Sequence, residues 1–256
     1  MVVRASKSGR YYAIKVYSDY YLEQKGHLEC SAADIYSRER EILNSIQHPQ
    51  VPGYVDSFCD GNRYYLVQEY VQGNTLTALI EQGYRFDENL VKVLLADLLG
   101  IIDFLHTAND KRQAIIHRDL RLSNLMLAEG GLLLIDFGLA YRMKNNTDAA
   151  LLTKWRSMKA SRGISPSYEK MRQDLSLKSD LFGAGVVAVD LFSNSVVVNQ
   201  SLKWEAQIPV SQPFKSFIRS LLGVEGNFAS CKEAIKQLSL LSRSEGSNNG
   251  LRDSKA

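Results

Sequence analysis

Residues 115–141, IIHRDLRLSNLMLAEGGLLLIDFGLAY, form the stretch that most limits what this chain can fold into. Two short apolar runs, Leu125–Leu127 and Leu132–Ile135, lie on either side of Glu129-Gly130-Gly131. Apolar runs joined by a short glycine-containing turn predict a β-hairpin. The hairpin would fix the spacing between the two charged loops at its ends.

Polar side chains that can bind metal or take up protons occupy both of these loops. Asp119 and Asn124 precede the hairpin, and Asp136 follows it. We therefore expect the three side chains to converge. Carboxylate and amide oxygens are suitable ligands for a hard divalent cation, and a carboxylate that is left free can accept a proton.

The two loops together resemble those of a known family. His117-Arg118-Asp119-Leu120 with Asn124, followed by Asp136-Phe137-Gly138, is similar to H-R-D-L-x-x-x-N and D-F-G of the eukaryotic-type (Hanks-type) serine/threonine protein kinases. The pair of motifs in this order is far more specific than either motif alone. The nearest style is that of the bacterial members.

The resemblance implies an α+β, bilobal protein-kinase fold. An N-lobe over residues 1–71 would hold a small antiparallel sheet and one helix, and a mainly α-helical C-lobe would span 72–240. The polar residues 241–256 are expected to form a disordered tail.

A lysine and a glutamate near the start of the chain extend the resemblance. Tyr12-Ala13-Ile14-Lys15 is similar to the kinase V-A-I-K strand. The helical run Ser31–Ile46 is similar to the C-helix that follows it. Glu39 is the preferred partner of Lys15, and Glu41 is its competitor.

For the nucleotide, the resemblance implies ATP as cofactor. Lys15, held by Glu39, would bind the phosphates. The residues expected around adenine are Val2, Ala13 and Met126, together with backbone groups of Glu69 and Val71.

For the transfer step, the resemblance implies Mg²⁺ and a protein substrate with Ser or Thr. Asp136 and Asn124 would bind the metal, and Asp119 would take the proton of the substrate hydroxyl. Arg121 stands where Ser/Thr kinases usually carry a lysine that contacts the γ-phosphate. An arginine keeps the charge in a bulkier, forked group.

Apolar patterning predicts the remaining elements. Val2–Ala5 with Tyr11–Tyr17, and Val51–Phe58 with Tyr64–Tyr70, are expected to be strands. Beyond Gly73 the chain is expected to turn helical, and the predicted helices are Asn89–His106, Phe214–Leu222 and Ala229–Leu238. Residues Lys178–Val186 resemble the start of the family's buried F-helix, which implies that Asp180 caps the helix and holds the loop of Asp119 by hydrogen bonds to its backbone.

Several positions depart from the family pattern. The first strand and the glycine-rich loop of the family would precede Val2 and have no counterpart in this sequence. Glu169 fits the glutamate of the A-P-E motif, but Asn227 stands where an arginine usually pairs with it. Arg118 suggests control by phosphorylation of the segment after Gly138, with candidates at Thr147, Thr153, Ser157 and Ser161.

The composition is that of an ordinary soluble globular protein. The net charge is +3 without a basic run, so nucleic-acid binding has no electrostatic support. The apolar stretch Leu181–Val198 contains Asp190 and reads as a buried helix rather than a membrane segment. Three cysteines far apart, and no visible signal peptide, favour a reducing, cytoplasmic location.

Two alternatives remain open from the sequence. A pseudokinase would keep the fold as a nucleotide-binding or scaffold module, as the missing glycine-rich loop suggests. A small-molecule phosphotransferase of kinase-like fold is disfavoured by Arg118 and by the Ser- and Thr-containing segment that follows Gly138.

Overall fold

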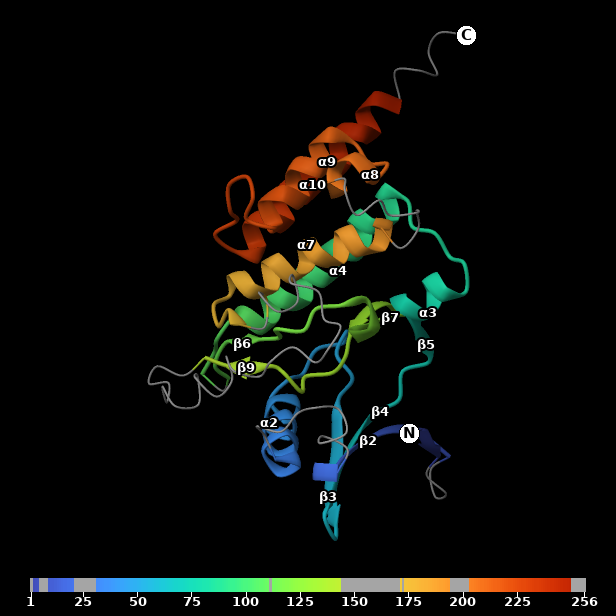
Figure 1. The fold of residues 1–256 in the computed structure, drawn as a ribbon, viewed down its shortest axis with the longest axis vertical. Helices are drawn as coiled ribbons and strands as arrows, with labels where there is room; N and C mark the ends of the chain where they lie inside the picture. Colours follow the sequence, from blue (N-terminus) through green and yellow to red (C-terminus); the bar gives the residue numbers. More distant parts are fainter. Residues whose placement is uncertain are drawn as a thin grey trace.

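The computed structural model describes residues 2–4, 9–20, 31–110, 112–143, 171, 173–193 and 203–249, which form two lobes (Figure 1). The smaller lobe holds an antiparallel sheet in the order β1-β2-β4-β3. Its strands are β1 (Val2–Arg4), β2 (Tyr11–Tyr17), β3 (Tyr54–Asp60) and β4 (Arg63–Glu69). The predicted strand from Val51 begins only at Tyr54, because Pro52 lacks the N–H that a paired strand needs.

Helix α2 (Ala32–Asn44) packs beside this sheet. Its start is fixed by Ser31, whose side chain accepts a hydrogen bond from the Asp34 N–H. Ile35, Ile42 and Leu43 recur at helical spacing and are buried, so the apolar face of the helix fixes its orientation. Glu39, on the same helix, is fully buried despite its charge.

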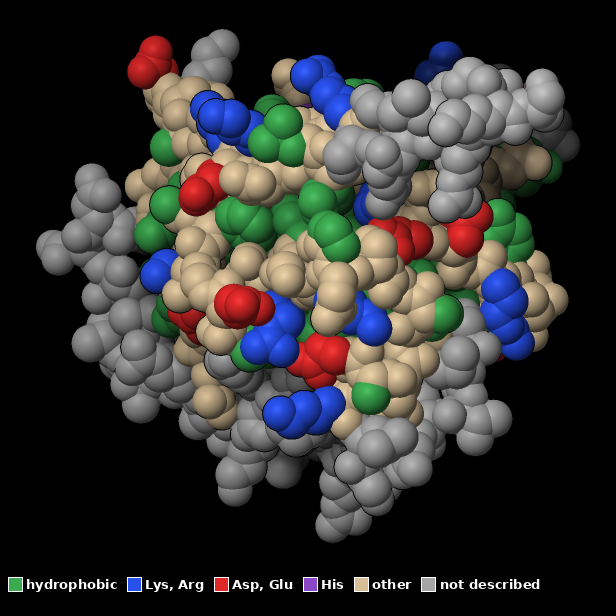
Figure 2. Space-filling model, turned by 90° about the horizontal axis from the view of Figure 1, so that it is seen from above, with side chains coloured by type: hydrophobic (Ala, Val, Ile, Leu, Met, Phe, Trp, Pro, Cys, Tyr) green, Lys and Arg blue, Asp and Glu red, His purple; other side chains and the backbone are tan. Residues whose placement is uncertain are grey.

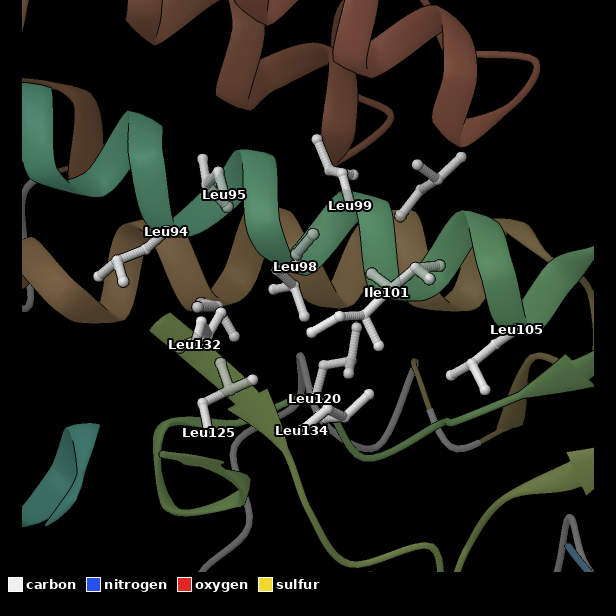
Figure 3. Packing of buried hydrophobic residues seen from close by; sticks show 14 of the residues in the cluster. Leu94, Leu95, Leu98, Leu99, Ile101, Leu105, Leu120, Leu125, Leu132 and Leu134 are labelled. Atoms are coloured by element: carbon white, nitrogen blue, oxygen red, sulfur yellow. The ribbon is translucent and has the colours of Figure 1, made fainter. Parts of the chain in front are cut away.

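The larger lobe is built around α4 (Glu88–His106), which Asp87 caps at its start. In Figure 3, Leu98 and Ile101 point from α4 toward the hairpin residues, while Leu99 points to the opposite side. All three side chains are fully buried. The helix therefore lies between the hairpin and the helices that follow it in the chain.

The predicted hairpin is present as β7 (Leu125–Ala128) and β8 (Gly131–Leu134). A short strand, β5 (Gly73–Thr75), adds to β7 in a segment predicted to be helical. Gly73 allows this close pairing, since a Cβ there would lie 2.5 Å from the carbonyl oxygen of Leu127.

Short elements and four further helices complete the described part of the lobe. The short elements are α3 (Leu76–Glu81), β6 (Ile115–Ile116), the 3₁₀ turn η1 (Leu122–Asn124) and β9 (Tyr141–Arg142). The helices are α7 (Lys178–Ser193), α8 (Trp204–Gln207), α9 (Gln212–Leu221) and α10 (Cys231–Asn249).

The predicted disordered tail needs correction over its first part. Helix α10 continues to Asn249, and Leu241 packs against the hydrophobic core, which stabilises the extra turns. Residues 250–256 lie outside the described part of the chain.

At the end of the molecule that carries α9 and α10, Figure 2 shows side chains of both charge signs interspersed with apolar ones. Within the described ranges, every helix is too short or too polar to cross a lipid bilayer. The α+β, bilobal fold predicted from the sequence is confirmed.

Candidate active site

Lys15 lies between two carboxylates from different parts of the chain. Its Nζ is 2.9 Å and 2.8 Å from the two carboxylate oxygens of Glu39, and 2.7 Å from Oδ1 of Asp136. Glu39 comes from α2, and Asp136 follows β8. The structure thus pairs Lys15 with Glu39, while Glu41 points to solvent. Gly138 lies close by, and its N–H donates to Asp136 Oδ1 at 3.1 Å.

Lys15 and Asp136 each favour the ionised state of the other. Burial alone would lower the pKa of Lys15, but Glu39 and Asp136 outweigh it and raise the pKa above the usual 10.5. Burial would raise the pKa of Asp136, but Lys15 and the Gly138 N–H lower it below 3.8. The lysine's contribution to stability is therefore lost only as the pH rises beyond 10.5, and that of Asp136 only as it falls below 3.8. Lys15 and Asp136 are both charged between these limits.

A residue that the sequence reasoning missed completes the cluster. The hydroxyl of Tyr17 donates to Oε2 of Glu39 at 2.6 Å, and Tyr17 is buried. Burial and the Glu39 carboxylate raise the pKa of this hydroxyl, so it remains a donor. The signal was available, because residues two apart in a strand share a face and Lys15 lies on the same strand.

Replacing Tyr17 by Phe should therefore lower stability. The variant leaves a fully buried carboxylate with one donor fewer, and hydrogen bonds to charged groups contribute about 1.5–3 kcal/mol. Tyr54→Phe is the matched control, since its hydroxyl bonds to the neutral Oγ of Ser57 at 2.8 Å. Chemical denaturation should show the larger loss for Tyr17→Phe; equal losses would mean that the charge of Glu39 does not strengthen this bond.

Asp119 and Asn124 lie together in the loop His117–Asn124, called the catalytic loop below. Nδ2 of Asn124 donates to the carbonyl oxygen of Asp119 at 2.9 Å and to its Oδ2 at 3.1 Å. Both residues are largely buried. The Ile135 N–H donates to the carbonyl of Asn124 at 2.9 Å, which ties this loop to the segment carrying Asp136.

Asp180, near the start of α7, holds the backbone of the catalytic loop. Its Oδ2 accepts from the His117 N–H and its Oδ1 from the Arg118 N–H, both at 2.8 Å. Arg118 has a positive φ of 64°, a conformation rarely adopted by a side chain of this size. Asp180 holds the backbone in that conformation from a fully buried position. The sequence predicted this bond from the resemblance.

The residues predicted to hold Mg²⁺ have oxygens that suit it. Asp136 uses Oδ1 for Lys15 and Gly138, and its side chain is 43% exposed, so Oδ2 can face a ligand. Asn124 uses its nitrogen toward Asp119, which directs its oxygen elsewhere. Among the described residues no group of three His, Cys, Asp or Glu gathers. Mg²⁺ commonly takes one or two protein oxygens and completes its shell with phosphates and water, so this pair fits.

Other predicted residues lie further from the Lys15 cluster. Arg121 precedes η1 and lines a cavity of about 210 Å³ with Glu81 and Asp190. Glu69 and Val71 line a groove of about 780 Å³ whose lining includes neither Lys15 nor Asp136. The N–H of Glu69 donates to the Gly53 carbonyl at 3.0 Å and is not available to a base.

The three residues predicted around adenine come from both lobes. Val2 and Ala13 are directly opposite each other across β1 and β2. Met126 lies on β7, opposite Thr75 and Leu133. In Figure 1 the sheet that carries Val2 and Ala13 lies below the hairpin strand β7, which carries Met126, so the three residues belong to two different lobes.

Two arginines, which the sequence reasoning did not identify, anchor α2 to the other lobe. Nη2 of Arg38 donates to the carbonyl of Gly138 at 2.8 Å. Arg142, on β9, donates to the carbonyl of Glu41 at 3.0 Å and to Oγ of Ser45 at 3.2 Å. The helix that carries Glu39 is therefore tied to the segment on both sides of residue 140.

A small sheet with one long helix, a mainly helical second lobe, and acidic loops facing a lysine between them is the architecture of a kinase fold. The chain belongs to the protein kinase domain family, whose model matches residues 1–230.

Named relatives are similar to it over much of this range. "Serine/threonine-protein kinase B" of Synechocystis is 30% identical over 86% of this chain and 40% of its own length. "Probable serine/threonine-protein kinase YbdM" of Bacillus subtilis is 36% identical over 42% of the chain and 41% of its own length. The cAMP-dependent protein kinase catalytic subunit of Schizosaccharomyces pombe is 30% identical over 59% of the chain and 28% of its own length. The chain thus spans less than half the length of these relatives.

Proposed function

We propose that this protein is an ATP- and Mg²⁺-dependent protein kinase that phosphorylates Ser or Thr in proteins. The observation that carries the proposal is the position of Lys15 between Glu39 of one lobe and Asp136 of the other, in a kinase fold. A cation held by two carboxylates from different lobes suits the binding of phosphates. The names of the relatives favour Ser and Thr as acceptors.

In this mechanism Lys15 binds the α- and β-phosphates and Glu39 orients it. Asp136 and Asn124 would hold Mg²⁺, which supplies charge neutralisation on the phosphates when bound. Phosphoryl transfer has a loose transition state, so positioning and charge account for most of the rate enhancement. The interlobe bonds of the cluster provide such positioning before any nucleotide binds.

Asp119 would receive the proton of the substrate hydroxyl. The hydroxyl oxygen bonds to the γ-phosphorus, the bond from that phosphorus to the β,γ-bridging oxygen breaks, and the proton passes to the Asp119 carboxylate. Asn124 donates to Oδ2 of this carboxylate and so fixes its orientation. Arg121, two residues after Asp119 in the sequence, is proposed to contact the γ-phosphate.

We also propose that phosphorylation of the segment after Gly138 controls the activity. Arg118 donates to the Leu139 carbonyl at 3.2 Å, and Arg38 bonds to the neighbouring Gly138 carbonyl. Two guanidinium groups at the start of the following segment could bind a phosphorylated side chain there. The candidates Thr147, Thr153, Ser157 and Ser161 lie outside the described residues.

The direct test is incubation of the protein with γ-labelled ATP, Mg²⁺ and a generic protein substrate, followed by phosphoamino-acid analysis. We expect label on Ser and Thr, and none when the Mg²⁺ is chelated. Nucleotide binding without transfer would support the pseudokinase alternative. If a small hydroxylated molecule is added and only that molecule is labelled, the small-molecule phosphotransferase alternative would be supported.

A further inference from the structure

A buried chain of hydrogen bonds runs from α10 through α4 to the catalytic loop. His106 is the last residue of α4, Asp180 lies near the start of α7, and Cys231 is the first residue of α10. Asp180 is fully buried, Cys231 is 2% exposed, and the His106 side chain is 7% exposed. Water can replace the hydrogen-bond partners of these three side chains only if a helix moves.

His106 contacts both of the other residues through its two ring nitrogens. Nε2 is 2.9 Å from Oδ2 of Asp180, and Nδ1 is 3.7 Å from Sγ of Cys231. The same Asp180 oxygen also accepts from the His117 N–H at 2.8 Å. The imidazole therefore bonds directly to the group that holds the catalytic loop.

The charge of Asp180 decides the direction of each bond. Burial opposes ionisation, but the hydrogen bond from His106 outweighs it and lowers the pKa of the Asp180 carboxyl. An ionised carboxylate only accepts, so the Nε2 of His106 must carry a proton. In a neutral imidazole the Nδ1 is then an acceptor.

The thiol of Cys231 can supply the matching donor. Burial, followed by the charges of Asp180 and Asp103, raises the pKa of Cys231 to about 12, so the sulfur keeps its proton. A thiol is a weak donor that can bond to an imidazole nitrogen. If Sγ donates to Nδ1, the side chains of Cys231, His106 and Asp180 are all hydrogen-bonded, and no second charge is placed in the core.

We propose that Cys231 is a positioning residue whose S–H donates to Nδ1 of His106, which keeps the Nε2–H directed at Asp180 and thereby holds the catalytic loop. The bond geometry stands independently of any activity, whereas its effect on turnover rests on the proposed kinase function.

The test compares three substitutions of Cys231 in the full-length chain. Cys231→Ala removes the donor, Cys231→Val removes it while filling the space, and Cys231→Ser keeps a donor. Cys59→Ala, at an exposed position on β3, is the control. The ring ¹⁵N shifts of His106 report its proton positions, and amide hydrogen exchange reports the bonds of His117 and Arg118 to Asp180.

In the unmodified chain we expect the Nε2 of His106 to carry a proton toward Asp180 and the Nδ1 to accept a hydrogen bond from Cys231. In the Ala and Val variants the Nδ1 shift should move toward that of an unbonded nitrogen, and the His117 and Arg118 amides should exchange about two- to tenfold faster. Cys231→Ser should restore both readings, and Cys59→Ala should change neither. In the phosphotransfer assay, kcat should fall about two- to fivefold in the Ala and Val variants while KM for ATP stays constant, since the Lys15 cluster is untouched.

An imidazolium, or protonation at Nδ1 alone, in the unmodified chain would overturn the proposal. Exchange rates in the Ala and Val variants equal to those of Cys59→Ala would also overturn it, as would failure of Ser to restore them. A chain without phosphotransfer activity would count against the proposed function alone, because the ¹⁵N shifts and the exchange rates still decide the role of Cys231.

Discussion

Replacing Asp119 by Asn is expected to lower phosphotransfer by about 10²–10⁴-fold, the usual contribution of a general base. The amide has nearly the same shape and its oxygen can still accept from Asn124, so the loop should keep its conformation. It cannot take the proton of a substrate hydroxyl. Steady-state kinetics should therefore show the loss in kcat, with ATP affinity unchanged.

Asp56→Asn, an exposed change on β3, serves as the control for removal of one negative charge. Both variants should unfold at the same denaturant concentration as the unmodified protein. Full activity of Asp119→Asn would exclude this residue as the proton acceptor. Loss of ATP binding would instead place it in the nucleotide site.

Lys15→Met should abolish useful activity and also destabilise the fold. Loss of a charge that stabilises phosphate typically costs about 10²–10³-fold in rate. The change also leaves Glu39, fully buried, and Asp136 without their shared cation. Removal of one partner from a buried pair costs about 3–5 kcal/mol. Since Lys15 is 33% exposed, we expect about 1–3 kcal/mol here.

The double variant Lys15→Met with Glu39→Gln separates the two effects. The introduced glutamine side chain carries no charge and can still accept from the Tyr17 hydroxyl, so most of the lost stability should return. Activity should not return. Lys236→Met, on an exposed face of α10, is the control. If the double variant is no more stable than the single one, the buried charge of Glu39 is not the source of the instability.

The sequence predicted the elements whose signals are local. The hairpin β7–β8 follows from two apolar runs around Gly130 and Gly131, and α4 from its apolar stripe. The pairing of Glu39 with Lys15 came from the family spacing and agrees with the geometry. The roles assigned to Val2, Arg121 and Val71 stay predictions, because they concern contacts with a nucleotide.

What the sequence could not predict depends on contacts between distant segments. Arg38 and Arg142 bond to backbone carbonyls about 100 residues away, and a carbonyl is present at every position of the chain. Nothing near His106 in the sequence indicates its contacts with Asp180 and Cys231. The extension of α10 depends on packing of Leu241 against a core assembled from other helices.

The separation of partners along the chain sets the order in which the Lys15 cluster can form. Lys15 and Glu39 are 24 residues apart, whereas Lys15 and Asp136 are 121 apart. During synthesis the first pair can therefore close long before Asp136 has left the ribosome, and loop closure over the longer distance costs more entropy. A nascent chain would carry the pair of Lys15 and Glu39 before Asp136 is available to join it. Competence for chemistry would then arrive in a single late step, when the second lobe docks.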